Sequence, residues 1–185
     1  MRRTKASLHD ALIGLARDKS YCSIAVKEIL DRANVGKSTF YMHFRDKDHL
    51  LESGIHEILQ SFRDQPRSGS ALERVLSFSL PLLKHIDGHR RIAGPKMDRD
   101  GRVMMHQHMQ HVLTDLIVDE LARVTASRPK AQIPTKLVAR HVASTFVLVL
   151  NWWVESDSPL SPADVDAHFR VLVASSLREL VSHAG

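Results

Sequence analysis

The chain has 185 residues, of which 43% are hydrophobic and 25% charged, so it is long and apolar enough to form a globular protein with a buried core. Its single cysteine excludes an intrachain disulfide, which fits a reducing cytoplasm. The net charge is +5, and the first fifty residues hold ten Lys or Arg against six Asp or Glu. This concentration of positive charge is typical of a nucleic-acid-binding segment, and ordinary surface solvation is the alternative.

The first predicted helix covers residues 4–19, where apolar side chains recur on one face. Arg3 and Lys5 belong to a basic arm, which either contacts DNA phosphates and a minor groove or is a frayed, solvated terminus. The arm is not the apolar run of a signal peptide, so we expect a cytoplasmic protein. Cys22, shortly after the helix, is interpreted as a small packing residue and not as a redox sensor.

Two short helices joined by a tight turn are predicted next. Residues 25–33 carry apolar side chains at helical spacing. Asn34 tolerates the left-handed conformation that ends a helix, Val35 supplies an apolar residue for the inside of the turn, and Gly36 is expected to loosen the backbone before the second helix, residues 37–44. This order is the helix-turn-helix layout, whose second helix enters the major groove of DNA.

The second helix combines polar and cationic side chains with two aromatic anchors, Phe40 and Phe44, that we expect to be buried. Such a surface suits the base edges and phosphates of double-stranded DNA, although a surface helix of mixed polarity is the alternative. The predicted DNA contacts are Lys37, Ser38, Thr39, Tyr41, Met42 and His43. Within this set, Lys37 and Thr39 are best placed for base edges, and Met42 for a thymine methyl group.

Residues 5–55 resemble the TetR/AcrR family of bacterial transcriptional regulators. The matching residues are Ile29, Ala33, Val35, Ser38, Thr39, Phe40, Tyr41, His43, Phe44, Lys47, Leu50 and Leu51. Residues 151–155 and 159–162 are more loosely similar to the last two helices of one large subgroup. The resemblance implies an all-α fold, with a helix-turn-helix domain over residues 1–64 and a helical ligand-binding and dimerisation domain over residues 65–185.

The same resemblance implies a function and two phosphate contacts, from Tyr41 and Lys47. We expect a homodimeric repressor that a small ligand releases from a pseudo-palindromic operator. A regulator that activates transcription, or that acts through a protein partner, is the alternative.

Ala25 departs from the family, which usually has Thr at this position. A Thr there would form a capping box with Glu28 and could touch a phosphate, whereas Ala does neither. We expect Ser23 to substitute for it, or the helix to begin slightly frayed, at a cost of about 1 kcal/mol.

Helices continue to the end of the chain. Their predicted ranges are 46–63, 71–86, 100–124, 135–155 and 162–182. Pro81 predicts a kink in the second of these, and the glycines and proline of residues 85–95 predict an interruption. Residues 65–70 are a candidate domain boundary, and residues 127–134 a loop. The longest apolar stretch contains Asn151 and is too short to span a membrane.

Residues 102–111 are rich in His and Met, which are plausible metal ligands. On a helix, however, His106 and His108 point about 200° apart, so we expect neither a metal nor a cofactor. The methionines either line a ligand pocket or fill a plain core. The candidate pocket residues are His85, Met105, His108, Met109, Asn151 and Trp152.

The last two helices have broad apolar faces, which predict a four-helix interface in a homodimer. The candidate interface residues are Phe146, Trp153, Phe169, Leu172 and Leu177. Alternatively, both helices only cover their own domain.

Enzymatic activity is not expected, because the sequence contains no Gly-rich phosphate loop, nucleophile elbow or zinc-type helix motif. A metal-dependent enzyme using the His-rich helix is a distant alternative.

Overall fold

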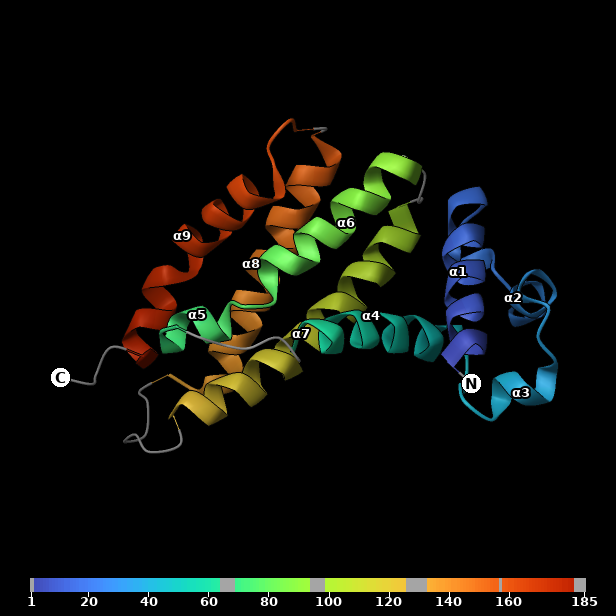
Figure 1. The fold of residues 1–185 in the computed structure, drawn as a ribbon, viewed down its shortest axis with the longest axis horizontal. Coiled ribbons are helices and arrows are strands. Elements are labelled where there is room, and N and C mark those ends of the chain that lie inside the picture. Colours follow the sequence, from blue (N-terminus) through green and yellow to red (C-terminus); the bar gives the residue numbers. More distant parts are fainter. Residues whose placement is uncertain (1, 64–68, 94–98, 126–132, 157, 182–185) are drawn as a thin grey trace. The chain divides into compact units, whose positions relative to one another are not determined.

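The computed structural model describes residues 2–63, 69–93, 99–125, 133–156 and 158–181, and all regular structure in these ranges is helical (Figure 1). The predicted all-α fold is therefore confirmed. The elements are α1 (Arg2–Asp18), η1 (Tyr21–Ser23), α2 (Val26–Ala33), α3 (Lys37–Tyr41), α4 (Lys47–Arg63), α5 (Ala71–Val75), α6 (Ser79–Ala93), α7 (Arg99–Thr125), α8 (Thr135–Glu155) and α9 (Pro162–Val181).

The predicted helix over residues 71–86 is two helices, α5 and α6. Ser70 begins α5 with a capping box, in which its hydroxyl accepts from the Glu73 N–H at 3.2 Å and the Glu73 carboxylate accepts from the Ser70 N–H. Pro81 is the third residue of α6, inside the first turn, where backbone N–H groups have no intrahelical acceptor. Pro81 therefore lies near the start of a helix and does not kink one.

The predicted interruption within residues 85–95 is absent as far as Ala93, because α6 continues through Gly88. Gly88 is exposed, and the helix is anchored about one and a half turns earlier by the buried Leu82 and Leu83. Most of the predicted domain boundary, residues 65–70, and most of the predicted loop, residues 127–134, lie outside the described ranges. The same holds for residues 94–98.

The chain divides into two compact units, Met1–Glu57 with Ala93–Met109, and Ile58–Ile92 with Gln110–Gly185. α4 and α7 each contribute residues to both units. The functional division at residue 64 that the sequence suggests stays a prediction.

The first unit has a core drawn from α1 to α4. α2 packs against α1, and α3 follows after a short turn (Figure 1). Its fully or almost fully buried side chains are Leu8, Leu12, Ala16, Tyr21, Ile24, Ile29, Phe40, Phe44, Leu50 and Leu51. Each buried Leu, Ile or Phe side chain contributes about 1.5–3 kcal/mol.

The second unit has a core centred on α8 and α9, which pack side by side (Figure 1). Phe146 of α8 meets Phe169 of α9 edge to face, with ring centroids 5.2 Å apart, and Phe78 contacts both rings. Arg170 extends the contact to the α5–α6 junction, since its Nε lies 2.6 Å from the Asp166 carboxylate and its guanidinium donates to the Leu76 carbonyl.

α8 is the one helix in the described ranges that is long and apolar enough to cross a membrane, and half of its apolar window is buried in the protein. Its buried side chains include Val142, Phe146, Val149 and Trp153, which form the centre of the second unit.

Candidate nucleic-acid interface

The turn between α2 and α3 is made by Asn34, Val35 and Gly36. Asn34 has φ 52° and ψ 49°, the left-handed conformation predicted for it, and the Val35 N–H donates to the Leu30 carbonyl at 3.1 Å. Gly36 has φ −69°, a value that any residue adopts, and its surroundings would admit a side chain. The turn therefore depends on Asn34, and the freedom expected of Gly36 is not used.

α3 is anchored by two aromatic rings. Phe40 and Phe44 are 0% and 2% exposed, and their ring centroids lie 5.6 Å apart. The prediction that both are buried is confirmed. The helix ends at Tyr41, three residues earlier than predicted, so Met42 and His43 lie in the following turn.

The rest of α3 and its turn present polar and apolar groups at the surface. Lys37 and Ser38 are exposed, Tyr41 is 51% and Met42 73% exposed, and Thr39 and His43 are half-buried. Lys37 Nζ lies 6.0 Å from the Tyr41 ring centroid. Met42 thus adds an exposed apolar side chain to this surface.

The basic arm is the first turn of α1, so it is not frayed from Arg3 onward. The Arg3 carbonyl accepts from the Ser7 hydroxyl. Lys5 Nζ lies 3.7 Å from the Glu57 carboxylate and 5.8 Å from the Phe44 ring centroid. Arg3 is exposed, whereas Lys5 is directed at groups of its own unit.

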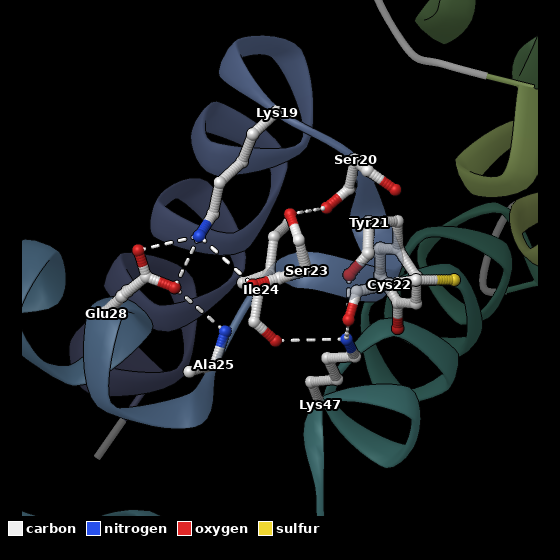
Figure 2. Close-up of polar contacts among 9 residues, drawn as sticks. All are labelled: Lys19, Ser20, Tyr21, Cys22, Ser23, Ile24, Ala25, Glu28 and Lys47. Atoms are coloured by element: carbon white, nitrogen blue, oxygen red, sulfur yellow. Dashed lines mark hydrogen bonds and ion pairs between the residues drawn. The ribbon is translucent and has the colours of Figure 1, made fainter.

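Lys47, the first residue of α4, directs its ammonium group at the turn between α1 and α2. Its Nζ donates to the carbonyls of Tyr21 at 2.7 Å, Cys22 at 3.2 Å and Ile24 at 3.0 Å (Figure 2). An ammonium group has three protons, and each has an acceptor here.

The start of α2 is stabilised without a hydroxyl at Ala25. The Glu28 carboxylate accepts from the Ala25 N–H at 2.9 Å, which is half of a capping box, and Lys19 Nζ lies 2.6 Å from the same carboxylate oxygen (Figure 2). The hydrogen bond from Lys19 and that from the Ala25 N–H lower the pKa of Glu28. Ser23 is not the substitute cap, because its hydroxyl donates to the Ser20 carbonyl.

Two residues of the turn between α1 and α2, Cys22 and Tyr21, differ in burial. Cys22 is exposed and therefore is not a packing residue. Tyr21 is buried and donates its hydroxyl to Asp48 at 2.6 Å; burial first, and then this hydrogen bond, raise the pKa of the phenol.

Comparison with known proteins agrees with this geometry. Residues 8–53 match the sequence model of the tetR family of bacterial regulatory proteins. This segment of the chain is therefore similar to the DNA-binding segment of TetR-family regulators. The predicted resemblance is confirmed, and the family is one of transcriptional regulators and not of enzymes.

The relatives are distant in sequence but similar in fold. A TetR transcriptional regulator from Streptococcus agalactiae 2603V is 22% identical, with a TM-score of 0.54 over 93% of this chain and 94% of that one. A TetR regulator from Rhodococcus sp. RHA1 is 15% identical, with a TM-score of 0.58 over 96% of each chain. The uncharacterized HTH-type regulator YxbF of Bacillus subtilis is 22% identical over 92% of this chain and 44% of its own length, so the chain spans less than half of that relative.

The predicted pocket residues are divided between the two units, and their role stays a prediction. Met105, His108 and Met109 belong to the first unit, and His85, Asn151 and Trp152 to the second. Met109 is buried, and His108 Nδ1 lies 2.8 Å from the Glu52 carboxylate. A shallow surface hollow in the first unit is lined by other residues, Ser7, Asp10, Ala11, Arg32 and Ala33. Among the described residues, no group of three or more His, Cys, Asp or Glu side chains could hold a metal ion.

The predicted interface residues differ in exposure. Phe146, Trp153, Phe169 and Leu177 are at most 1% exposed, so they fill the second unit, and Leu172 is 55% exposed. Trp153 donates its Nε1–H to the Leu160 carbonyl at 3.0 Å, whereas Trp152 is 48% exposed. Trp153 therefore belongs to the core of the second unit and Trp152 to its surface. Leu148 and Val171, which the sequence analysis does not name, are exposed as Trp152 and Leu172 are, and we call these four residues the exposed apolar set.

Proposed function

We propose that this protein regulates transcription by binding double-stranded DNA through α3 and the turn that follows it. The observation that carries this proposal is the division of one short element into two faces. Phe40 and Phe44 are buried, while Lys37, Ser38, Tyr41 and Met42 are exposed beside them. A helix anchored in this way presents its outer side chains in a defined orientation to the major groove.

Chemistry divides the proposed contacts into two groups. Tyr41 and Ser38 carry hydroxyl groups suited to phosphate oxygens, which position a protein on DNA. Lys37, Thr39 and Met42 are suited to base edges, and His43 lies at the end of the same surface.

Selecting duplexes from a random DNA pool tests the proposal. We expect a pseudo-palindrome whose half-sites lie about one helical turn, or 34–36 Å, apart. Tyr41→Ala should weaken binding to all sequences, and Thr39→Ala should change the preferred sequence. Lys136→Ala, on exposed α8 surface, is the matched control and should leave binding unchanged. Failure to enrich any duplex would contradict the proposal.

We further propose that the regulator is a homodimer formed by α8 and α9. Leu148 and Trp152 are one helical turn apart on α8, and Val171 and Leu172 are adjacent on α9; all four are between 48% and 76% exposed. Large apolar side chains grouped on two packed helices are typical of a subunit interface.

Repression that a small apolar ligand relieves is the mode we propose, with the predicted pocket residues as its starting candidates. The mechanical element would be α4, a continuous helix whose first residue touches the turn before α2 and whose last residues belong to the second unit. A regulator that activates, or that responds to a protein partner, is the alternative. A reporter gene placed behind a selected operator distinguishes repression from activation.

A further inference from the structure

The turn between α1 and α2 is enclosed by two lysine ammonium groups that approach it from different sides (Figure 2). Lys47 Nζ donates to the carbonyls of residues 21, 22 and 24 at 2.7–3.2 Å. Lys19 Nζ donates to the remaining carbonyl, that of Ser23, at 3.1 Å, and also binds Glu28. Four consecutive carbonyl groups therefore accept from lysine.

The position of Lys47 is not explained by the helix it begins. A cation at the N-terminus of a helix is disfavoured by the helix dipole. The three carbonyl dipoles of the turn offset this cost, and the Tyr21 ring lies 4.7 Å from the same nitrogen. Asp48, the next residue, accepts the Tyr21 hydroxyl, so the first two residues of α4 bind both ends of one buried tyrosine.

The turn between α1 and α2 determines the position at which α2 begins. Ala25 follows Ile24 directly and has no side-chain cap, so its N–H depends on the Glu28 carboxylate that Lys19 holds. A change in the backbone of residues 21–24 would therefore move the start of α2, and α3 follows α2 through a three-residue turn.

We propose that Lys47 is a positioning residue, which fixes the α1–α2 turn and thereby the orientation of α3, and that it does not contact a DNA phosphate. A phosphate contact would require the ammonium group to give up at least one of its three carbonyl acceptors. The part of this proposal that concerns DNA rests on the function proposed above. The clamp, by which we mean the three hydrogen bonds from Lys47 Nζ to the carbonyls of residues 21, 22 and 24, is a property of the free protein.

Thermal unfolding without DNA tests the clamp. Lys47→Met keeps the length of the stem but removes all three donors, and should lower Tm by about 4–8 °C, or prevent cooperative folding. Lys37→Met, an exposed lysine of α3, is the matched control and should change Tm by about 1 °C or less. A Lys47→Met protein that melts together with the wild type would overturn the proposal.

The salt dependence of binding to a duplex selected by the wild type separates positioning from phosphate contact. Each lost phosphate contact reduces the slope of log K against log salt by about 0.9. Lys47→Met should bind the duplex more weakly with an unchanged slope. Lys37→Met removes a cation from the DNA-facing surface, so it shows how far the slope falls when such a cation is lost. Because the proposed dimer carries two copies of Lys47, a slope reduced by about 1.8 in Lys47→Met would contradict positioning.

Lys47→Arg decides the question if Lys47→Met does not fold. Arg keeps the charge, but its planar guanidinium does not fit three carbonyls that converge on one point. Positioning predicts a lower Tm and weaker binding, while a phosphate contact predicts equal or tighter binding. If the wild type selects no duplex, the proposed function fails, and the melting comparison still tests the clamp.

Discussion

His9 on α1 is enclosed by aromatic and helical neighbours in the first unit. Its ring centroid lies 6.1 Å from that of Phe44, and a side chain at Gly54 would come within 3.2 Å of the ring. Its Nε2 is buried and has no hydrogen-bond partner among the described residues. Burial lowers the pKa of His9, and the nearby Glu57 carboxylate opposes this shift only in part.

This pKa predicts how stability depends on pH. The unfolded chain takes up a proton at His9 near pH 6.5, and the folded protein does so only at lower pH. The stability that depends on a neutral His9 is therefore fully present above pH 6.5. It is lost as the pH falls toward the pKa of His9 in the folded protein. In melting curves between pH 8 and 5, His9→Gln should show a weaker loss of Tm than the wild type. His141→Gln, at an exposed position, is the control, and an unchanged pH profile in His9→Gln would contradict the assignment.

At the scale of elements, α2 begins without the hydroxyl that its first turn can use. Ala25 has φ −88° and ψ 146°, which suit an N-cap, and the Glu28 half of the capping box is already in place. Ala25→Ser should complete the box by accepting from the Glu28 N–H and stabilise the protein by about 1 kcal/mol. Denaturant titration measures this gain. Ala167→Ser, inside α9 and exposed, is the matched control and should give none.

α3 allows two neighbouring aromatic residues to be compared on one helix. Phe40 is 0% exposed and Tyr41 is 51% exposed. Phe40→Ala should cost about 3–5 kcal/mol, because it opens a cavity among Phe44 and its neighbours. Tyr41→Ala should change stability by less than about 1 kcal/mol and act on DNA affinity alone. Equal losses of stability in the two variants, measured by denaturant titration, would refute this division of roles.

At the scale of the whole molecule, the proposed dimer depends on side chains that face away from the core of the second unit. Leu172→Glu places a charge on the exposed apolar set and should shift the sedimentation of the protein to that of a folded monomer. Phe169→Glu should instead unfold the second unit, because Phe169 is 0% exposed. Lys136→Glu is the control for a surface charge change. A Leu172→Glu protein that sediments with the wild type would argue against this interface.

Ligand release makes a reciprocal prediction for the whole molecule. A ligand lowers operator affinity only if it binds the DNA-incompetent conformation more tightly. The coupling should be about 1–3 kcal/mol, and operator DNA should weaken ligand binding by the same factor. Titrating a candidate ligand with and without a selected operator measures both. Equal ligand affinities in the two titrations would exclude that compound as the inducer.

Local patterns in the sequence were sufficient for much of this protein. The bounds of α8 agree with the predicted residues 135–155, and the helix-turn-helix unit was found with its left-handed Asn34 and its buried Phe40 and Phe44. Helical periodicity, turn chemistry and burial of isolated aromatic residues depend on neighbours within a few positions, so a sequence displays them directly.

Tertiary structure alone decided which side of an apolar helix faces inward and what each lysine binds. α8 and α9 are apolar on more than one side, so periodicity could not distinguish Trp153 in the core from Trp152 at the surface. Lys37 and Lys47 are chemically identical, yet only Lys47 meets three carbonyl groups, which come from residues 23 to 26 positions earlier in the chain. Contacts at that separation exist only after α1, α2 and α4 have packed together, so no local sequence pattern displays them.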